Sequence, residues 1–466
     1  MKKLLALTLS VSALTLPVFA QSNATTEEQI KQFLSQDVLS AQADYSGDIT
    51  LSKENGVYNA LIPAGKLKQT NKIVPAFSFL MPEQGQLNGN TRYRITLDKL
   101  IQVMPELNEV LEKYKASYST FKFTGDIVPA LDLSEQERLE MTDLTIPLEE
   151  NVNVTIKDVS LVQKSAINAN GDGNSNFQFL AQGITGSHIF GNVTIQKWEM
   201  GASLPMAMRV SSYLEDITKV NTIKQHMTLS NVQFNSMFSK GSFDLKQTFD
   251  TSADEKNQLT AVFSLAADNV VISEQPDMPK SANAILTFSG FTLEQVKKHL
   301  QAMEAYQQIA ALPRNAQNNQ ALATAKAKAD VASNALLKNM IMDVDASVYS
   351  DKYQVLVKGT MKMQSEQFNC TMTVVNFDYL APQPKAVNQA ACQRVMDKVL
   401  DGTLTGDNFQ KAYEEDCSER KGPLDHLRPY ATTAKRTTVN GKEALIFDLK
   451  YDGNQLFINA QPVQGI

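Results

Sequence analysis

Alternating hydrophobic and polar residues dominate the chain and predict strands. Asp48 to Ser52 and Val57 to Ile62 flank Asn55-Gly56, a pair that accepts the positive dihedral angles of a tight hairpin turn. Alternation of this kind is typical of antiparallel sheets with one covered and one solvated face. Further alternating segments lie at residues 243–249, 261–265 and 445–451.

One predicted strand changes the face on which its hydrophobic residues lie. Val152, Val154 and Ile156 share one face, whereas the pattern continues with Val159 and Leu161 on positions of the other parity. A β-bulge inserts one residue and shifts the parity by one position. The pattern therefore predicts a bulge at Lys157-Asp158.

Hydrophobic residues at helical spacing predict helices in four places, besides two near the cysteines. Pro105 falls inside the second helix and should bend or split it, because proline removes a backbone hydrogen bond. Ser134 followed by Glu137 has the spacing of a capping box and indicates one further short helical turn. The four helices are predicted at Thr25 to Ala41, Leu97 to Tyr114, Leu293 to Ala310 and Ala316 to Met340.

Two of these helices look like copies. A Met-Pro pair precedes each helix, at Met81-Pro82 and Met278-Pro279, and further strands follow each. We therefore expect a tandem duplication, with two unrelated amphipathic helices of similar length as the alternative. In a duplication Met104 and Leu300 would be buried at matching positions.

The predicted fold class is α+β, mainly antiparallel β, with two similar curved-sheet-plus-helix units followed by a helical hairpin and a β-meander. A mature chain of this length is expected to form two or three domains. The predicted domains are a signal peptide at 1–20, a β-rich unit at 21–235 with helix 97–114, a second β-rich unit at 236–382 with helices 293–310 and 316–340, and the hairpin and meander at 383–466.

The first residues have the pattern of a secretion signal. Lys2 and Lys3 precede the apolar run Leu4 to Leu16, and Val18-Phe19-Ala20 supplies small residues for a signal peptidase. The pattern predicts cleavage after Ala20 and a periplasmic protein, with an uncleaved anchor as the alternative. After this segment no run has the length that a membrane helix needs.

Composition and charge exclude several partners. The chain has 44 basic and 50 acidic residues, and two of the basic residues fall in the signal. A mildly acidic chain lacks the electrostatic footprint of a protein that binds nucleic acid or anionic headgroups. We therefore expect no nucleic-acid partner. The lack of a long apolar run after the signal predicts no membrane span in the mature chain.

Three cysteines fall in the last hundred residues, and an exported protein is expected to form at least one disulfide. Cys392 and Cys417 lie on two helical patterns, at comparable distances from the turn that separates them, whereas Cys370 lies in a strand pattern. The predicted disulfide is Cys392–Cys417, although spacing alone leaves the other pairings open. Three buried thiols are the alternative.

One segment resembles a calcium loop. Asn168 to Asn176 carries oxygen-bearing side chains at alternate positions and a glycine at the sixth. However, Phe179 stands where a bidentate Glu closes such a site, and Asp172 is the one carboxylate left. We interpret the segment as a polar hairpin loop and expect no metal and no cofactor.

No catalytic motif stands out. Ser187 and His188 are neighbours on a predicted strand, where adjacent side chains point to opposite faces. Carboxylate runs such as Glu149-Glu150 and Glu414-Glu415-Asp416 are typical of solvated surfaces. The four histidines also show no metal-ligand spacing; they are His188, His226, His299 and His426.

These observations favour a non-enzymatic periplasmic protein that binds an apolar, lipid-like ligand or an envelope component. This hypothesis depends on the many predicted sheets, on helices able to cover an apolar face, and on the lack of a catalytic motif. The alternative is a structural scaffold of the cell envelope that adds strands to a partner through exposed strand edges. The third possibility is a hydrolase whose carboxylates the sequence cannot pair.

Overall fold

The computed structural model forms two compact units. Unit 1 comprises residues 1–274 and 291–332, and unit 2 comprises residues 275–290 and 333–466. The predicted signal peptide lies outside the described residues. The structure describes residues 25–37, 43–67, 72–149, 152–168, 173–188, 191–205, 222–236, 239–273, 278–310, 316–381, 389–400, 403 and 423–463.

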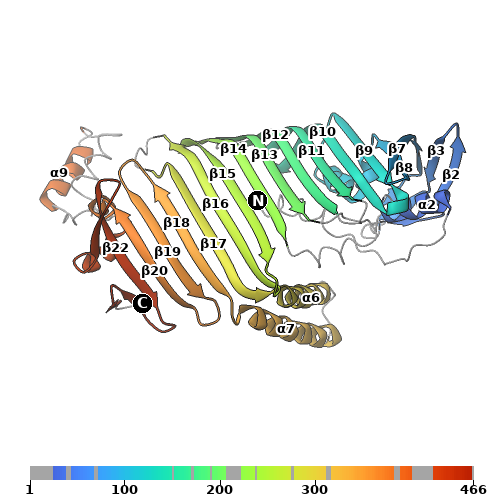
Figure 1. Cartoon of the computed structure of the whole chain (residues 1–466). Coiled ribbons are helices and arrows are strands. Elements are labelled where there is room, and N and C mark those ends of the chain that lie inside the picture. The colour runs from blue at the N-terminus through green and yellow to red at the C-terminus, as the bar shows by residue number, and fades with distance from the viewer. Residues whose placement is uncertain are drawn as a thin grey trace. The chain divides into compact units, whose positions relative to one another are not determined.

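Unit 1 contains one large sheet and two small ones. In the large sheet the strands β7 to β16 follow one another as an antiparallel meander (Figure 1). The small sheets have the strand orders β1-β4-β5 and β2-β3-β6. The strands are β1 (Ala43–Tyr45), β2 (Thr50–Glu54), β3 (Val57–Ile62), β4 (Gly65–Leu67), β5 (Ile73–Val74), β6 (Phe77–Met81), β7 (Glu83–Leu87), β8 (Asn90–Leu97), β9 (Thr120–Val128), β10 (Leu133–Glu149), β11 (Val152–Ile167), β12 (Gly173–His188), β13 (Gly191–Leu204), β14 (Ile223–Ser236), β15 (Lys240–Ala253) and β16 (Gln258–Ile272).

The helices of unit 1 match the predicted periodicity closely. Pro105 splits the second predicted helix, because it stands at the first position of α4, where its missing N–H costs nothing. Leu97, the predicted start of that helix, is instead the last residue of β8. The helical segments are α2 (Thr26–Asp37), α3 (Leu100–Val103), α4 (Pro105–Lys113), η2 (Pro129–Leu131), α6 (Leu293–Ala310) and α7 (Ala316–Leu337, of which 333–337 belong to unit 2).

Unit 2 is a second antiparallel assembly with its own core. Its strands pair in the order β17-β18-β19-β20-β22, and β22 also pairs with β21 and β23. Phe447, Val374 and Leu427 are fully buried in its core. The elements are β17 (Ser281–Thr292, of which the last two residues belong to unit 1), β18 (Ile341–Tyr349), β19 (Gln354–Lys362), β20 (Gln367–Val375), α8 (Phe377–Leu380), α9 (Gln389–Leu400), η3 (Asp425–Tyr430), β21 (Lys435–Val439), β22 (Lys442–Tyr451), β23 (Leu456–Ile458) and β24 (Gln461–Pro462).

The tight turn predicted at Asn55-Gly56 is confirmed, and a second Asn-Gly pair forms a turn of the same kind. Asn55 and Gly56 have φ values of 50° and 83° and join β2 to β3. Asn440 and Gly441, with φ values of 50° and 76°, join β21 to β22 in the same way. Positive φ at both central residues gives the turn whose twist matches the two strands.

The predicted capping box at Ser134 and Glu137 is wrong. Both residues lie inside β10, which pairs with β9 and β11 along this stretch. The spacing Ser-x-x-Glu is short and common, so tertiary pairing overrides its local preference. The described capping boxes of this kind occur at Thr25 with Glu28 and at Thr292 with Gln295.

The mainly antiparallel β character of the fold is confirmed, whereas the matched burial expected of a repeat is not. Met104 packs against a buried core cluster, but Leu300 is 60% exposed. The first predicted domain boundary, between residues 235 and 236, falls between the last two residues of β14 inside unit 1. The second, between residues 382 and 383, falls inside unit 2.

The cysteines are placed only in part. Cys370 lies in β20 as a free, half-buried thiol, and burial raises its pKa. Cys392 lies in α9, and Cys417 lies outside the described residues, so the Cys392–Cys417 disulfide stays a prediction. Among the described helices, none is both long and apolar enough to cross a membrane.

Candidate functional site: the apolar face of the large sheet

The strands of unit 1 align their hydrophobic side chains into rows that cross the sheet. In an antiparallel sheet, directly paired residues share a face, so the strand register identifies each row. We call this surface the apolar face. Its central row contains Phe123, Leu139, Leu161, Phe179, Met200, Met227, Gln247 and Leu265 from β9 to β16.

A second row runs beside the central one, two residues further along each strand. Its single tryptophan, Trp198, meets Phe179 of the central row edge to face, with ring centroids 5.2 Å apart. Such a pair adds a favourable quadrupole interaction to apolar burial. The second row contains Phe121, Met141, Val159, Ala181, Trp198, Leu229, Leu245 and Ala267.

The parity shift noticed in the sequence extends from β10 to β16, but at Lys157 it is not the predicted bulge. Lys157 is left out of the ladder, yet the register with β10 and β12 is the same on both sides of it. Instead, residues with a left-handed backbone conformation lie at this level on the alternate strands β10, β12, β14 and β16, and beside Asn231 and Asn269 the strand register also shifts by one residue. The left-handed residues are Asp143, Gly183, Asn231 and Asn269, with φ between 50° and 62°.

These left-handed residues keep one face apolar beyond the point where the parity changes. Leu144 pairs with Ile156, and Ile156 pairs with Ile184, so a third apolar row continues on the same face. Glycine, asparagine and aspartate are the residues that adopt positive φ most readily. At each of the four positions the sequence has a residue that readily adopts positive φ. Only the strand register shows that the four residues lie in one line across the sheet.

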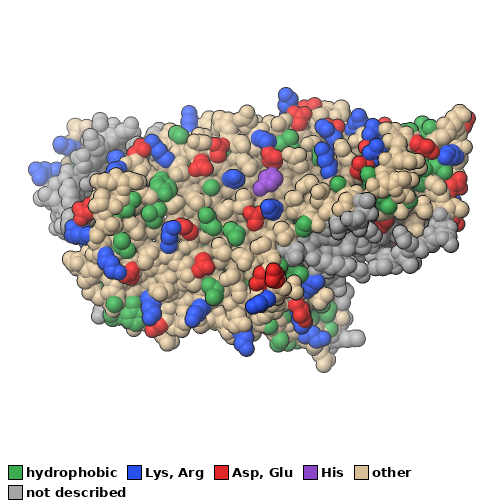
Figure 2. Space-filling model, viewed as in Figure 1, with side chains coloured by type: hydrophobic (Ala, Val, Ile, Leu, Met, Phe, Trp, Pro, Cys, Tyr) green, Lys and Arg blue, Asp and Glu red, His purple; other side chains and the backbone are tan. Residues whose placement is uncertain are grey.

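The opposite face of the sheet is polar. Glu199 accepts a hydrogen bond from Gln178 and forms an ion pair with Lys197, and the Lys197 ammonium holds the pKa of that carboxyl below its usual range. His226 lies against Gly201 on this face, and its Nε2 is 4.0 Å from Glu199 Oε1. Figure 2 shows charged side chains of both signs spread over the strands, with isolated hydrophobic side chains among them.

Helices cover the apolar face at one end. Leu100 and Leu111, from α3 and α4, pack on Phe121, Leu139 and Met141 of β9 and β10. The helix α2 closes the adjoining core through its buried residues, together with β3, β6 and β8. In the described part of unit 1, the core clusters extend no further than β11.

Beyond β11 the same rows continue over β12 to β16 without extensive contact to any helix that the structure describes. Several of their side chains, including Phe179, Met200 and Met227, are half-buried. Leu265 is 36% exposed and Val193 is 45% exposed. A contiguous apolar surface of this kind on a folded protein is typical of a binding site.

The buried Nε1 of Trp198, on the apolar face, lacks a hydrogen-bond partner among the described residues. Ser134 is only 1% exposed, and its hydroxyl lies beside the Glu137 carboxyl. Nearby, burial raises the pKa of the Glu137 carboxyl, and the Ser134 hydroxyl lowers it to a smaller extent. Buried polar groups are normally paired, so each exception needs a physical explanation.

The candidates singled out in the sequence do not assemble into a site. Asn168 follows β11 and Asn174 lies in β12, as expected of a hairpin loop, and Asp172 lies outside the described residues. Ser187 and His188 are consecutive residues at the end of β12. His226, His299 and His426 lie in β14, α6 and η3.

Acidic and metal-binding residues do not converge either in the described part of the chain. Glu149 ends β10, whereas Glu150 and the run Glu414-Glu415-Asp416 lie outside the described residues. No group of three or more His, Cys, Asp or Glu side chains that could hold a metal ion occurs among the residues that the structure describes.

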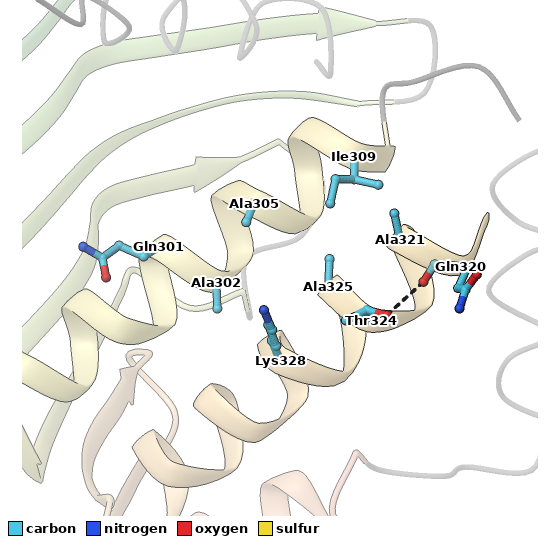
Figure 3. Close-up of a pocket in the computed structure, with 9 residues that line it drawn as sticks. All are labelled: Gln301, Ala302, Ala305, Ile309, Gln320, Ala321, Thr324, Ala325 and Lys328. Carbon is cyan, nitrogen blue, oxygen red and sulfur yellow. Dashed lines mark hydrogen bonds between the residues drawn. The ribbon is translucent and has the colours of Figure 1, made fainter. Parts of the chain in front are cut away.

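A cavity of about 650 Å³ lies between α6 and α7 (Figure 3). Alanines from both helices line it, and Thr324 donates a hydrogen bond to the backbone oxygen of Gln320, 3.0 Å away. Lys328 is its one charged lining residue. The lining contains no nucleophile next to a base, so we assign no chemistry to this cavity.

A second cavity, of about 770 Å³, lies in unit 2. Arg436 and Glu443 form an ion pair across 2.6 Å in its wall, and Asp351 of the wall is paired with Lys280 at 2.6 Å. Its charges thus largely compensate one another, as on a solvated surface.

No model of a known protein family matches this chain, and no curated protein or solved structure is significantly similar to it.

Proposed function

We propose that the protein is an exported, non-enzymatic binder of an apolar, lipid-like ligand, and that the ligand lies on the uncovered part of the apolar face. The single observation that carries this proposal is the continuation of the apolar rows over β12 to β16, beyond the last core cluster. The N-terminal pattern ending at Ala20 supports export to the periplasm.

The dimensions of the uncovered part fit an acyl chain. Neighbouring strands lie about 4.8 Å apart, so β12 to β16 offer an apolar row of about 19 Å. Each buried methylene contributes about 0.8 kcal/mol, so ten of them supply about 8 kcal/mol before the costs of association. A chain of about sixteen methylenes contributes about 13 kcal/mol, which leaves about 8 kcal/mol after an association cost of about 5 kcal/mol and so corresponds to micromolar binding.

The composition of the rows supports a flexible hydrocarbon as the occupant. Met200 and Met227 are direct partners in the central row, next to Phe179. Unbranched thioethers adapt to ligands of varying shape, whereas aromatic rings give a firm platform. No charged side chain belongs to the central or second row.

The proposal can be tested by quenching Trp198, the only tryptophan of the chain, with a brominated acyl chain. Because Trp198 lies in the second row, dibromostearic acid bound on the apolar face should quench it with micromolar affinity. Met227→Asp should weaken this quenching at least tenfold, because the new charge would be desolvated by the chain. Ser230→Asp is the matched control on the same strand.

Ser230 suits this purpose because it pairs with Lys197 on the polar face. Its substitution should leave quenching unchanged. If wild-type protein shows no quenching up to about 100 μM chain, which corresponds to a binding free energy of about 5.5 kcal/mol, or if both variants bind equally, the apolar face is not the binding site.

We also keep the tandem duplication as a proposal. Its support is topological, because α3 and α4 separate the paired strands β8 and β9 just as α6 and α7 separate the paired strands β17 and β18. Superposition of the backbone of each helix-interrupted strand pair, β8 with β9 on β17 with β18, tests the proposal. A different strand twist or helix direction would contradict it.

A further inference from the structure

We propose that Gln225 and Gln247 form a subsite on the apolar face for the polar head of the ligand, and that this head is an uncharged group that both donates and accepts hydrogen bonds, such as a carboxamide. This inference rests on the proposed function, because it names the polar end of the same amphiphile.

The strand register places the two glutamines next to each other. Gln247 of β15 belongs to the central row, where it pairs with Met227 of β14 and Leu265 of β16. Gln225 lies two residues before Met227 on β14, so it faces the same side of the sheet. The two glutamines are diagonal neighbours on adjacent strands, with Cα atoms about 7–8 Å apart, a separation at which long side chains meet.

Hydrophobic side chains surround this pair of amides. Gln225 pairs with Ala202 of β13 and with Phe249 of β15, and Phe249 pairs with Phe263 of β16. Gln225 is exposed and Gln247 is partly exposed. No hydrogen bond joins either amide to another residue that the structure describes. Their donors and acceptors are therefore available to a ligand that lies on the uncovered rows.

The amides have no charged neighbour on this face among the described positions of β12 to β16. The central row, the second row and the row of Gln225 contain no lysine, arginine, aspartate or glutamate on these strands. Lys224 and Lys246 adjoin the glutamines in the chain, but the alternation of a strand directs them to the polar face. Glu137 belongs to the row of Gln225 but lies on β10, four strands or about 19 Å away.

This chemistry favours an uncharged head. A glutamine side chain has two N–H donors and one carbonyl acceptor. A carboxamide head has the same groups, so it can donate to the carbonyl of one glutamine and accept from the N–H of the other. A carboxylate or phosphate would lose water beside phenylalanine and methionine side chains without a basic partner, which is costly.

The subsite is tested with three ligands that share one acyl chain. Oleamide donates and accepts hydrogen bonds, methyl oleate only accepts them, and oleate is charged. Each is measured at pH 8, below its aggregation concentration, by its displacement of diphenylhexatriene, a fluorescent probe without a polar group. We expect oleamide to bind wild-type protein about fivefold more tightly than either methyl oleate or oleate, since one net hydrogen bond changes affinity by about that factor.

Variants separate the head from the chain. Gln225→Leu and Gln247→Leu should each weaken oleamide about fivefold and leave diphenylhexatriene unchanged, because only oleamide uses the amides. Gln247→Lys should reverse the preference and favour oleate, because it supplies the missing cation. Gln182→Leu is the matched control, since Gln182 is an exposed glutamine of β12 that pairs with Lys197 on the polar face. It should bind every probe as wild-type protein does.

Each outcome decides one question. If wild-type protein binds neither diphenylhexatriene nor any of the three acyl chains, the proposed function fails. If diphenylhexatriene binds but oleate displaces it as well as oleamide does, the head-group subsite is refuted and the apolar face stands. The same conclusion follows if Gln225→Leu and Gln247→Leu bind oleamide as tightly as the Gln182→Leu control.

Discussion

Leu100 and Leu300 lie on the two helices that the sequence suggests are equivalent, but the two side chains differ greatly in burial. Leu100 is fully buried, whereas Leu300 is 60% exposed. Both belong to unit 1. Leu100→Ala should therefore destabilise unit 1 strongly, and Leu300→Ala should have almost no effect.

The expected magnitude follows from the surroundings of Leu100. The Leu100 side chain packs with Leu111 of α4 on one side. On the other side it packs with Phe121, Leu139 and Met141 of the sheet. Removing a fully buried leucine side chain loses its transfer free energy and leaves a cavity, which together cost about 2–5 kcal/mol. We expect about 3 kcal/mol for Leu100→Ala.

Leu300→Ala should change the free energy of unfolding by less than about 0.5 kcal/mol, the usual range for surface substitutions. Alanine is also the better helix former, which offsets part of any lost contact in α6. The two substitutions remove the same atoms, so the difference between them measures the burial alone.

Urea unfolding followed by Trp198 fluorescence is the assay. Because Trp198 is the only tryptophan and lies in unit 1, its signal reports on the unit that carries both substitutions. With an m-value of about 3 kcal/mol/M, the midpoint should fall by about 1 M for Leu100→Ala. Equal shifts for the two variants would refute the packing of α3 on the sheet.

Three further predictions concern Gly183, Glu137 and the cysteines. Gly183→Ala should destabilise unit 1 by about 1–2 kcal/mol, because Gly183 has φ +62° and a Cβ would lie 3.0 Å from that of Lys157. Wild-type protein should lose stability as pH rises, and Glu137→Gln should abolish this dependence on pH. Peptide mapping of the protein isolated under oxidising conditions should recover Cys392 linked to Cys417, with Cys370 open to alkylation after unfolding.

The sign of the pH effect follows from the direction of the pKa shift. Burial raises the pKa of the Glu137 carboxyl above its ordinary value of 4.5, so the folded protein binds this proton more tightly than the unfolded chain. Stability contributed by Glu137 is complete below pH 4.5 and falls as pH rises to the folded pKa. A flat difference between wild-type protein and Glu137→Gln over pH 4–8 would contradict this.

Matched controls accompany the other two predictions. Gly186→Ala lies on the same strand as Gly183, has ordinary φ and meets no atom closer than 3.9 Å, so it should be tolerated. A larger loss for Gly186→Ala than for Gly183→Ala would refute the left-handed row. A peptide in which Cys370 is linked to either other cysteine would refute the predicted pairing.

The sequence by itself determined the elements whose causes are local. The helix Leu293–Ala310 was predicted with its observed ends, because its apolar stripe and its capping residues lie within one segment. The split at Pro105 and the turn at Asn55-Gly56 also follow from the conformational limits of single residues. These features require no contact distant in the chain.

Tertiary structure decided which residues form the candidate site. Asp143, Gly183 and Asn231 are about forty to fifty residues apart in the chain, and only strand pairing aligns them across the sheet. The parity shift at Lys157 was visible in the sequence, but a single strand cannot show whether its neighbours shift with it. The sequence therefore suggested an inserted residue where the structure has a line of left-handed residues.

Which part of the apolar face the helices cover also depends on contacts between segments that are distant in the chain. The alternation in β9 to β16 predicts one apolar face, but it does not show where α2, α3 and α4 pack or where their cover ends. Ser134 and Glu137 illustrate the same limit, since their local spacing favours a helix cap while pairing with β9 and β11 places them on a sheet. Local patterns fix secondary structure and faces, whereas the site depends on which distant surfaces meet.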